Sequence, residues 1–365
     1  MTQNVVILGA GVVGVAIAYE LSLRPEFHVT LLDTQPPAQG STGAALGVLM
    51  GIISRKTKGR AWQLRRRSMI RFPELLQELE QAGCPVPHNP DGILKLFDAE
   101  TDVSKLENLQ QKRHDGGWQL ELWDQGNINE TCPQITENIC AGAVYSPEDF
   151  QVQPVPFVQA LLEVAQQKGI ETAFEIESPK LNFDGGNCVS VTAGDRLFSC
   201  DWLIISAGLG SLEITKPLLA DFQMKPVLGQ AFHGKIPNYQ APDFQPVVSY
   251  NDVHVVPLGD GEFWVGATVE FPDDEGNLAA DQDLAQKVWE AAIAFYPALE
   301  NAEILRHWSG QRPRPEGQGA PVIQPLQGYQ NILLATGHYR NGVLLAPATA
   351  LKICDWLLAP ETIPR

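Results

Sequence analysis

The sequence of 365 residues lacks the features that would place it in several broad classes of protein. Its six cysteines include no Cys-x-x-Cys pair, so they predict neither a zinc site nor a redox-active disulfide. No apolar run reaches the roughly 18 residues that a membrane span requires. The segment Met1–Asn4 has no basic start of the kind that signal peptides carry. These absences predict a cytoplasmic protein with free thiols, no metal and no transmembrane segment.

Positive charge is scarce as well, and the formal net charge is -17. A general nucleic-acid-binding protein needs a basic surface to neutralise phosphates, so the charge argues against this class and against attraction to anionic lipid. The 44% of apolar residues and 19% of charged residues are typical of a folded chain. The length favours two domains over one.

Strand and helix patterns alternate near both ends of the chain, as in a mixed α/β fold. Between them, Val253–Val256 and Phe263–Thr268 flank Gly259-Asp260-Gly261 and predict a β-hairpin of an antiparallel sheet. We therefore expect two domains, each assembled from separated segments. The other predicted strands are Val5–Leu8, Val29–Leu32, Ile93–Phe97, Leu203–Ser206 and Asn331–Ala335; the predicted helices are Val12–Leu23, Trp62–Leu79, Lys105–Arg113, Phe157–Gln167, Leu284–Phe295 and Val343–Leu358.

The strongest local motif is Gly-Ala-Gly-Val-Val-Gly at Gly9–Gly14, between the first strand and the first helix. Gly9 permits a tight turn, Gly11 lets a pyrophosphate approach the backbone, and Gly14 allows close packing of the helix on the strand. The phosphates then lie at a helix N-terminus, which favours anions. Asp33 ends the next strand about 20 residues further on, where a carboxylate can accept hydrogen bonds from a ribose diol. The motif predicts a dinucleotide, with Gly9, Gly11, Val12, Val13, Gly14 and Asp33 as its cofactor-binding residues.

A run of small residues at Gly40–Leu49 favours FAD over NAD as that dinucleotide. Small side chains let a backbone lie along a bulky ligand, and hydroxyl groups can contact phosphate or ribitol oxygens. Close packing of a helix on a sheet is the alternative explanation of the run. The candidate cofactor-binding residues here are Ser41, Thr42, Ala45, Gly47 and Val48.

A second glycine-bearing loop lies far along the chain, within Leu334–Pro347. A strand runs into this loop and a helix follows, so the N–H groups of the helix start point to an acceptor. Reduced flavin carries negative charge near its N1 and C2 carbonyl, where such a helix start is favourable. A turn without a ligand is the alternative. The candidate residues are Gly337, Arg340, Asn341, Gly342 and Val343.

Together these stretches resemble the D-amino-acid oxidase (DAO) superfamily of FAD enzymes, and within it the glycine oxidase branch, which serves thiamine biosynthesis in bacteria. The resemblance extends over nearly the whole chain. It also rests on Phe150–Pro154, Val265–Thr268, Trp308–Pro313 and Gly337–Gly342, of which the last is the most diagnostic.

The resemblance implies a Rossmann-like FAD-binding domain and a substrate domain built on a largely antiparallel sheet that covers one face of the flavin. The first would comprise residues 1–86 with 146–225 and 307–365, and the second residues 87–145 with 226–306. It adds Lys180, Ala207 and Gly208 to the cofactor-binding residues.

The resemblance also implies a carboxylate site. Arg312 stands where the family binds the substrate carboxylate, and Arg340 would line the same site beside the flavin. A planar guanidinium suits a carboxylate because it binds bidentately and keeps its charge. The alternative role of Arg312 is a surface ion pair, and the alternative role of Arg340 is a structural one beside a helix. Arg314 is a competing candidate for binding the substrate carboxylate.

Three positions depart from the family pattern. His254 stands where glycine oxidases present a tyrosine to the substrate; an imidazole also donates a hydrogen bond, but it titrates near neutral pH. A histidine facing solvent is the alternative. Val48 replaces a common methionine, and Leu209 replaces an aromatic residue. No cysteine lies near Arg312–Arg314, where covalent relatives attach flavin, so we expect non-covalent FAD.

The predicted function is oxidative deamination of a small amino acid (glycine, sarcosine or a D-amino acid) by hydride transfer to FAD, with no acid–base residue required. Oxygen as acceptor would give hydrogen peroxide, whereas a D-amino-acid dehydrogenase would use a quinone or carrier. An NAD-dependent dehydrogenase and a flavin-binding protein without turnover are further alternatives. A homo-oligomer is left open. The basic stretch Arg55–Arg71 is a solvated helix face, an anion-attracting mouth of the site, or a contact with a partner or lipid surface.

Overall fold

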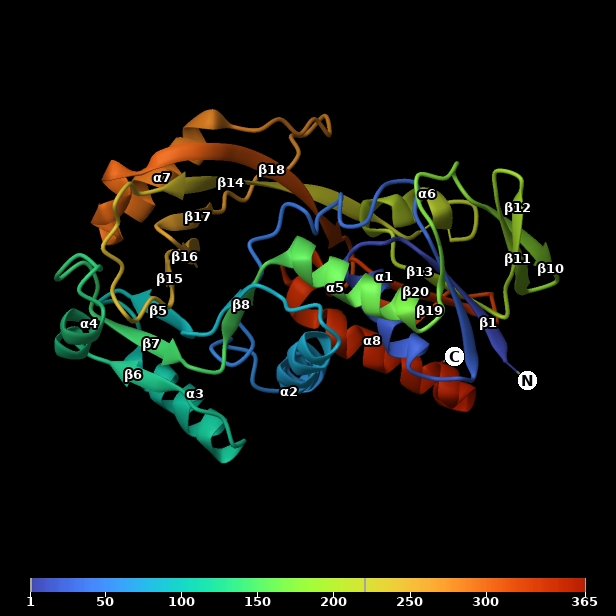
Figure 1. Cartoon of the computed structure of the whole chain (residues 1–365), viewed down its shortest axis with the longest axis horizontal. Helices are drawn as coiled ribbons and strands as arrows, with labels where there is room; N and C mark the ends of the chain where they lie inside the picture. The colour runs from blue at the N-terminus through green and yellow to red at the C-terminus, as the bar shows by residue number, and fades with distance from the viewer. Residues whose placement is uncertain (1, 220, 365) are drawn as a thin grey trace.

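The computed structural model describes residues 2–219 and 221–364. It has two lobes, one around a six-stranded sheet and one around an eight-stranded sheet (Figure 1). This mixed α/β architecture confirms the predicted fold class. Within the described part of the chain, no helix combines the length and apolar character needed to cross a membrane.

The six-stranded sheet is parallel except for one edge strand. Its central strands are continuous apolar runs because both faces are covered. One face packs against the helices α1 and α8, and the other against a small three-stranded sheet, β10-β11-β12. The strand order is β19 (Val322–Pro325), β20 (Ile332–Thr336), β13 (Trp202–Ile205), β1 (Gln3–Leu8), β2 (Phe27–Leu32) and β9 (Glu171–Ala173).

The eight-stranded sheet is antiparallel apart from the pair β15–β5. Helix α7 (Gln282–Phe295) packs on one face through Trp289 and Phe295, and the opposite face borders the functional cavity described below. The strand order is β18 (Glu303–Pro315), β14 (Met224–Lys235), β17 (Glu262–Gly266), β16 (Val253–Gly259), β15 (Val247–Tyr250), β5 (Ile93–Phe97), β7 (Gly142–Ser146) and β6 (Glu121–Trp123).

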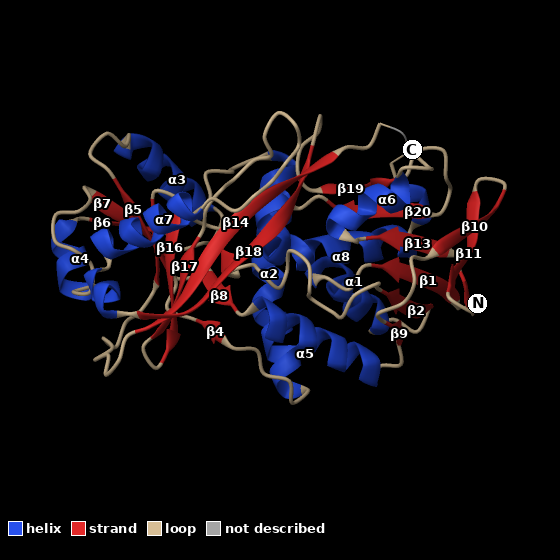
Figure 2. Cartoon of the chain, turned by 90° about the horizontal axis from the view of Figure 1, so that it is seen from above, coloured by secondary structure: helices blue, strands red, loops and turns tan. Residues whose placement is uncertain are grey.

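Strands β14 and β18 are the two longest, and they reach from the eight-stranded sheet toward the six-stranded one (Figure 2). They pair from Met224 opposite Pro315 to Lys235 opposite Glu303, with a register shift between His233 and Gly234. The boundary expected between residues 306 and 307 therefore falls inside β18. The division of the chain into two domains stays a prediction.

Every helix and strand predicted from the sequence is present, including the hairpin of β16 and β17. The helices are α1 (Val12–Ser22), α2 (Gly59–Gln81), α3 (Val103–Asp115), α4 (Gln125–Thr131), α5 (Pro154–Gln167), α6 (Ser211–Thr215), α7 and α8 (Gly342–Leu358), with 3-10 helices η1 (Gly208–Gly210), η2 (Pro297–Asn301), η3 (Tyr339–Asn341) and η4 (Pro360–Thr362). The remaining strands are β3 (Val48–Leu49), β4 (His88–Asn89), β8 (Phe150–Val152), β10 (Lys180–Asp184), β11 (Asn187–Ala193) and β12 (Arg196–Ser199).

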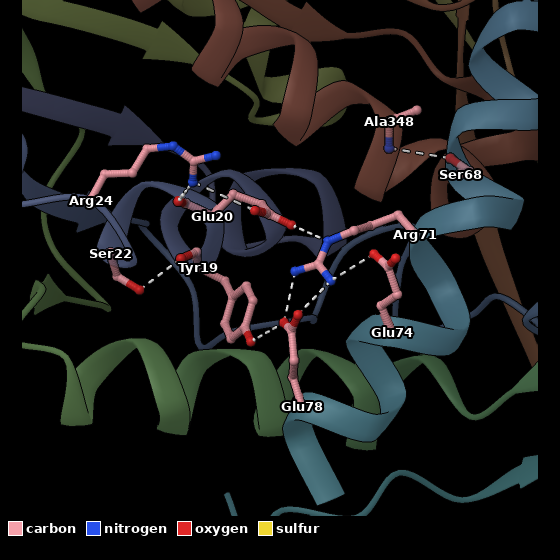
Figure 3. A network of polar contacts seen from close by, with 9 residues as sticks. All are labelled: Tyr19, Glu20, Ser22, Arg24, Ser68, Arg71, Glu74, Glu78 and Ala348. Atoms are coloured by element: carbon pink, nitrogen blue, oxygen red, sulfur yellow. Dashed lines mark hydrogen bonds and ion pairs between the residues drawn. The ribbon is translucent and has the colours of Figure 1, made fainter. Parts of the chain in front are cut away.

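The sequence left open that the basic stretch Arg55–Arg71 is a solvated helix face. This interpretation is wrong for the last residue of the stretch, Arg71. Arg71 on α2 is buried and binds Glu20 of α1 at 2.7 Å and both carboxylate oxygens of Glu78 at 2.7 Å (Figure 3). Tyr19 donates a hydrogen bond to the same Glu78 carboxylate. A buried guanidinium needs carboxylate partners. Because Arg71 finds one of them on α1 and another on its own helix, the network joins α1 to α2.

Candidate functional site

A cavity of about 980 Å³ lies where the two sheets meet. The start of α1, the segment 33–48, the end of β13 and the start of α8 line it from the six-stranded lobe. Strands β14, β16 and β18 line it from the eight-stranded lobe. The three motif regions predicted from the sequence thus meet in one place, although they lie far apart along the chain.

The turn after β1 has the geometry expected around a pyrophosphate. Gly9 has φ +110, and a Cβ at this position would lie 2.7 Å from the backbone of Ala207, so only glycine fits. Asp33 accepts a hydrogen bond from the Ala10 N–H at 2.6 Å, which fixes the carboxylate beside the turn. Each Asp33 oxygen accepts one backbone bond, so lone pairs remain for a ribose diol.

Two helices begin at the cavity. The first residues of α1 and of α8 line it, and neither helix has a side-chain cap or an acidic residue in its first turn. The N–H groups at such helix starts are free to bind an anionic group. Among the residues described, Thr42 is the only side-chain partner of an N–H group in α1: its hydroxyl accepts from the Val12 N–H at 3.0 Å.

The small-residue segment 40–48 lies against β18. Ser41 donates a hydrogen bond to the Gln311 carbonyl at 2.6 Å, and Trp308 Nε1 donates to the Ala44 carbonyl at 3.1 Å. A Cβ at Gly310 would lie 2.2 Å from that of Ala44. Small residues therefore serve close packing on β18 as well as lining the cavity, and they fix the part of β18 that carries Arg312.

The Arg312 side chain lies in the cavity without a carboxylate partner among the described residues. Its Nη1 donates to the carbonyls of Leu228 and Thr268, both at 3.1 Å. Its Nε and Nη2 have no hydrogen-bond partner within the described chain. Burial lowers the pKa of the guanidinium, and Arg340 lowers it further. A partly buried cation with free donors is suited to bind an anionic ligand.

His254 on β16 also lines the cavity, so the interpretation as a solvent-facing histidine is wrong. Its Nδ1 is buried and has no hydrogen-bond partner among the described residues. Burial lowers the pKa of the imidazole to about 4, and the nearby Arg340 contributes to the decrease. The ring is therefore neutral at physiological pH, contrary to the expected titration near neutrality, and it offers one unused hydrogen-bonding atom.

Arg340, on η3, lies at the same cavity and contacts the Asp252 carboxylate at 3.5 Å. Asp252 is in the turn between β15 and β16, and its side chain is mostly exposed. Screening by water weakens such an ion pair. Arg314, by contrast, contacts Glu316 at 3.5 Å and does not line the cavity.

Most of the residues predicted for the site line the cavity, together with the two departures Val48 and Leu209. Gly14 does not, because it packs against the turn: a Cβ there would lie 1.9 Å from the Gly9 carbonyl. Lys180 is exposed at the start of β10, and Asn341 accepts a hydrogen bond from Arg65. The predicted residues that line the cavity are Gly9, Gly11, Val12, Val13, Asp33, Ser41, Thr42, Ala45, Gly47, Val48, Ala207, Gly208, His254, Arg312, Gly337, Arg340, Gly342 and Val343.

Two buried charged residues that the sequence did not reveal brace the loop 51–56. Asp149 accepts hydrogen bonds from the N–H groups of Gly51, Ile52 and Ile53 at 2.7–2.8 Å. Arg113 donates to the carbonyls of residues 52, 54 and 56 at 2.7–2.9 Å. Asp149 could have been found from the sequence, because it directly precedes the Phe150–Pro154 motif. Arg113 could not, because no feature of the polar helix around it distinguishes this residue from its neighbours.

The arrangement fits FAD. A glycine turn with a carboxylate beside it matches the adenosine half of a dinucleotide, and the second helix start matches the electron-rich side of a flavin. The unused Nε and Nη2 donors of Arg312 and the His254 Nδ1, which lacks a partner among the described residues, lie on the sheet side of the same cavity. This combination can hold a carboxylate-bearing substrate against a redox cofactor.

Comparison with known proteins agrees with this geometry. A family model described as DAO, FAD dependent oxidoreductase, matches residues 4–356. The bifunctional protein ThiO/ThiG of Synechocystis sp. is 31% identical over 100% of this chain, and 53% of that relative is covered. The chain thus spans about half the length of the ThiO/ThiG relatives that it matches.

Glycine oxidase of Geobacillus kaustophilus matches nearly end to end, with 27% identity over 98% of this chain and 94% of the relative. The crystal structure of glycine oxidase from the same organism superposes with a TM-score of 0.85 and 25% identity, and covers 100% of this chain and 99% of that one.

Proposed function

We propose, from the premise that this chain belongs to the DAO family of FAD-dependent oxidoreductases, that it oxidises a small amino acid at the bond between Cα and the amine. The membership confirms the prediction of FAD as cofactor, and the NAD-dependent alternative is wrong. Glycine, sarcosine and D-amino acids are the substrates to test, because the relatives include glycine oxidases.

One observation carries this proposal: the cavity places the Nε and Nη2 donors of Arg312 and the Nδ1 of His254 on the same side, and none of these atoms has a hydrogen-bond partner among the described residues. A carboxylate would bind the two free donors of Arg312 as a bidentate pair. The neutral His254 would donate one further hydrogen bond without adding charge. Binding of this kind fixes the orientation of Cα, which is the main requirement of the reaction.

The chain supplies binding and orientation, and no described side chain needs to act as a general base. When bound, FAD supplies the acceptor for the hydride that leaves Cα, and the imine product is hydrolysed by water. Arg340 lies beside Arg312 at the cavity and adds positive charge where the carboxylate would bind. The buried surroundings strengthen these electrostatic contacts, because the local dielectric constant is low.

We propose oxygen as the electron acceptor, because relatives of this chain are named oxidases. Hydrogen peroxide would then be the second product. The names of these relatives do not favour the dehydrogenase alternative, in which a quinone or carrier accepts the electrons.

The test is anaerobic stopped-flow reduction of the purified holoenzyme with glycine, sarcosine and D-alanine. We expect bleaching of the flavin absorbance with at least one of them, and formation of hydrogen peroxide once oxygen is admitted. A holoenzyme that none of the three reduces, but that dithionite does, would contradict the proposal. Such a result would support the alternative of a flavin-binding protein without turnover.

A further inference from the structure

A buried carboxylate lies behind the wall of the cavity, that of Glu270 in the segment that follows β17. Glu270 is not among the described residues that line the cavity, so a bound substrate would not touch it. Burial of a charged group is costly unless other groups of the protein satisfy it. The contacts of Glu270 therefore show why the fold keeps a carboxylate at this position.

Three donors bind the Glu270 carboxylate. The Thr268 hydroxyl and the Gln230 Nε2 donate to its Oε1, the second of them at 2.9 Å. The Asp281 N–H donates to its Oε2 at 2.8 Å. Thr268 and Gln230 are themselves buried, and the Gln230 N–H donates to the Thr268 hydroxyl oxygen at 2.8 Å. The carboxylate is thus the centre of a buried polar network.

This network reaches Arg312 through two main-chain carbonyls. The Thr268 carbonyl accepts from Arg312 Nη1 at 3.1 Å, and the hydroxyl of the same threonine binds Glu270. The Leu228 carbonyl accepts from Arg312 Nη1 at 3.1 Å and from the Glu270 N–H at 2.9 Å. Glu270 therefore holds both acceptors of Nη1, one through its side chain and the other through its main chain.

The charge of Glu270 also suits a position behind Arg312. Burial and the neighbouring Arg340 lower the pKa of the Arg312 guanidinium, whereas Glu270 acts in the opposite direction. A carboxylate in direct contact with the guanidinium would occupy its donors and compete with a substrate. Glu270 acts through the two carbonyls instead, so Nε and Nη2 keep no partner among the described residues.

We propose that Glu270 is a positioning residue for the substrate carboxylate, because it holds the Thr268 and Leu228 carbonyls that orient Arg312. This inference rests on the proposed function and adds a residue that acts on the substrate only through Arg312. The side chain of Glu270 fixes the guanidinium, and the guanidinium fixes Cα of the substrate. A small displacement of the network is then passed on to the reacting bond.

The variant Glu270→Gln tests the proposal on the holoenzyme, because it keeps the size of the side chain and removes its charge. Neither orientation of the new amide satisfies all three donors, since only one of its two ends is an acceptor. We expect kcat/KM for flavin reduction by an active amino acid to fall roughly 10- to 100-fold. FAD content should not change. Glu262→Gln is the matched control, because Glu262 on β17 binds Lys235 at 2.9 Å and does not line the cavity.

A double variant separates positioning from a merely structural role. In the Arg312→Lys background, Glu270→Gln should change kcat/KM less than about threefold, because the guanidinium that transmits its effect is already absent. A structural defect would lower kcat/KM by the same factor in both backgrounds. The thermal midpoint is measured for each variant, since loss of stability is expected in both backgrounds and does not decide between the two roles.

Thr268→Val and Thr268→Ser repeat the comparison if Glu270→Gln does not give a folded holoenzyme. Thr268→Val removes the hydroxyl that donates to Glu270, whereas Thr268→Ser keeps it. We expect Thr268→Val to lower kcat/KM by at least about tenfold more than Thr268→Ser in the parent, and the two to be equal in the Arg312→Lys background. Equal values in the parent would overturn the proposal.

An unchanged kcat/KM in Glu270→Gln, or the same loss in both backgrounds, would also overturn it. Failure of the proposed function appears differently, as no flavin reduction by any amino acid. Titration of the flavin spectrum with acetate covers that case, because it needs no turnover. Glu270→Gln should weaken acetate binding at least about tenfold in the parent and less than about threefold in Arg312→Lys. Equal effects, or no acetate binding by the parent, would overturn the positioning role.

Discussion

The guanidinium group of Arg312 lies directly over Gly229. A Cβ at position 229 would be 2.2 Å from Arg312 Nη2 and 2.4 Å from its Cζ. Gly229 is on β14 and Arg312 on the neighbouring β18, so the cross-strand position of a glycine determines where the arginine can lie. The carbonyls of Leu228 and Thr268, which accept hydrogen bonds from Nη1, hold the same guanidinium group in place.

Gly229→Ala should therefore displace the Arg312 side chain while leaving the cofactor-binding turn intact. We expect a loss of roughly 10- to 100-fold in the rate of flavin reduction, because misplacement of a substrate by about 1 Å has effects of this size. Rapid-reaction kinetics and the FAD content of the variant measure the two effects separately. Gly186→Ala is the control, since a Cβ there has only an ordinary contact at 3.6 Å. Unchanged reduction by Gly229→Ala would refute the positioning role.

Arg312→Lys should keep the flavin spectrum and lose about 2–3 kcal/mol of substrate interaction, roughly 30- to 150-fold in the rate of flavin reduction. An ammonium group cannot reproduce the bidentate contact of a guanidinium. Arg314→Lys is the matched control, because Arg314 pairs with Glu316 and does not line the cavity. If Arg312→Lys is reduced as fast as the parent by every active amino acid, the carboxylate binds elsewhere.

The pH dependence of His254 should follow from its neutral state. Its pKa in the folded protein is about 4, below the ordinary 6.5, so the unfolded chain takes up the proton first as the pH falls. The stability that depends on the neutral ring is complete above pH 6.5 and is lost between pH 6.5 and 4. Relative to His254→Asn, the parent should lose about 1–3 kcal/mol of unfolding free energy over this window in urea titrations.

The same argument predicts that kcat/KM shows no ionisation of His254 between about pH 5.5 and 8. The pH profiles of the parent and His254→Asn should then have the same shape, even if their magnitudes differ. A step near pH 6.5 that is present in the parent and absent from the variant would show that the ring titrates in the active enzyme.

Asp33→Ala should weaken FAD retention by roughly 1.5–3 kcal/mol, because a charged acceptor is lost. The variant also loses the 2.6 Å bond from the Ala10 N–H, which holds the turn. Equilibrium dialysis of FAD compares it with Asp195→Ala, a substitution at an exposed turn residue. The rate of flavin reduction at saturating FAD should change little. Equally tight FAD binding by Asp33→Ala would exclude the ribose contact.

Arg71→Met should lower the free energy of unfolding by about 3–5 kcal/mol, because the buried Glu20 loses its 2.7 Å guanidinium partner and keeps only the longer contact with Arg24 at 3.7 Å among the described residues. Urea unfolding of the FAD-bound protein measures this, with Arg66→Met at an exposed position of the same helix as the control. KM for the substrate should not change. Equal stability of the two variants would mean that the network in Figure 3 contributes no net stability.

Much of the fold could be predicted because its signals are local. The helices and strands follow from the spacing of apolar residues, and α1 begins directly after the glycine turn as the motif predicted. Arg113 could not be identified, because its importance lies in contacts with the loop 51–56, far from it in sequence. A charged residue in a polar stretch carries no sign that it is buried.

The sequence by itself determined the class of cofactor and predicted the place where it binds. A tight glycine turn, a carboxylate at the end of the next strand and a helix start are short-range features, set by backbone sterics and the N–H groups of one helical turn. Tertiary structure alone decided that the Nδ1 of His254 is buried, that its ring is neutral, and that the carboxylate of Glu270 lies behind Arg312. Charge state and charge balance depend on burial and on neighbours brought together by strand pairing, which no single stretch of sequence encodes.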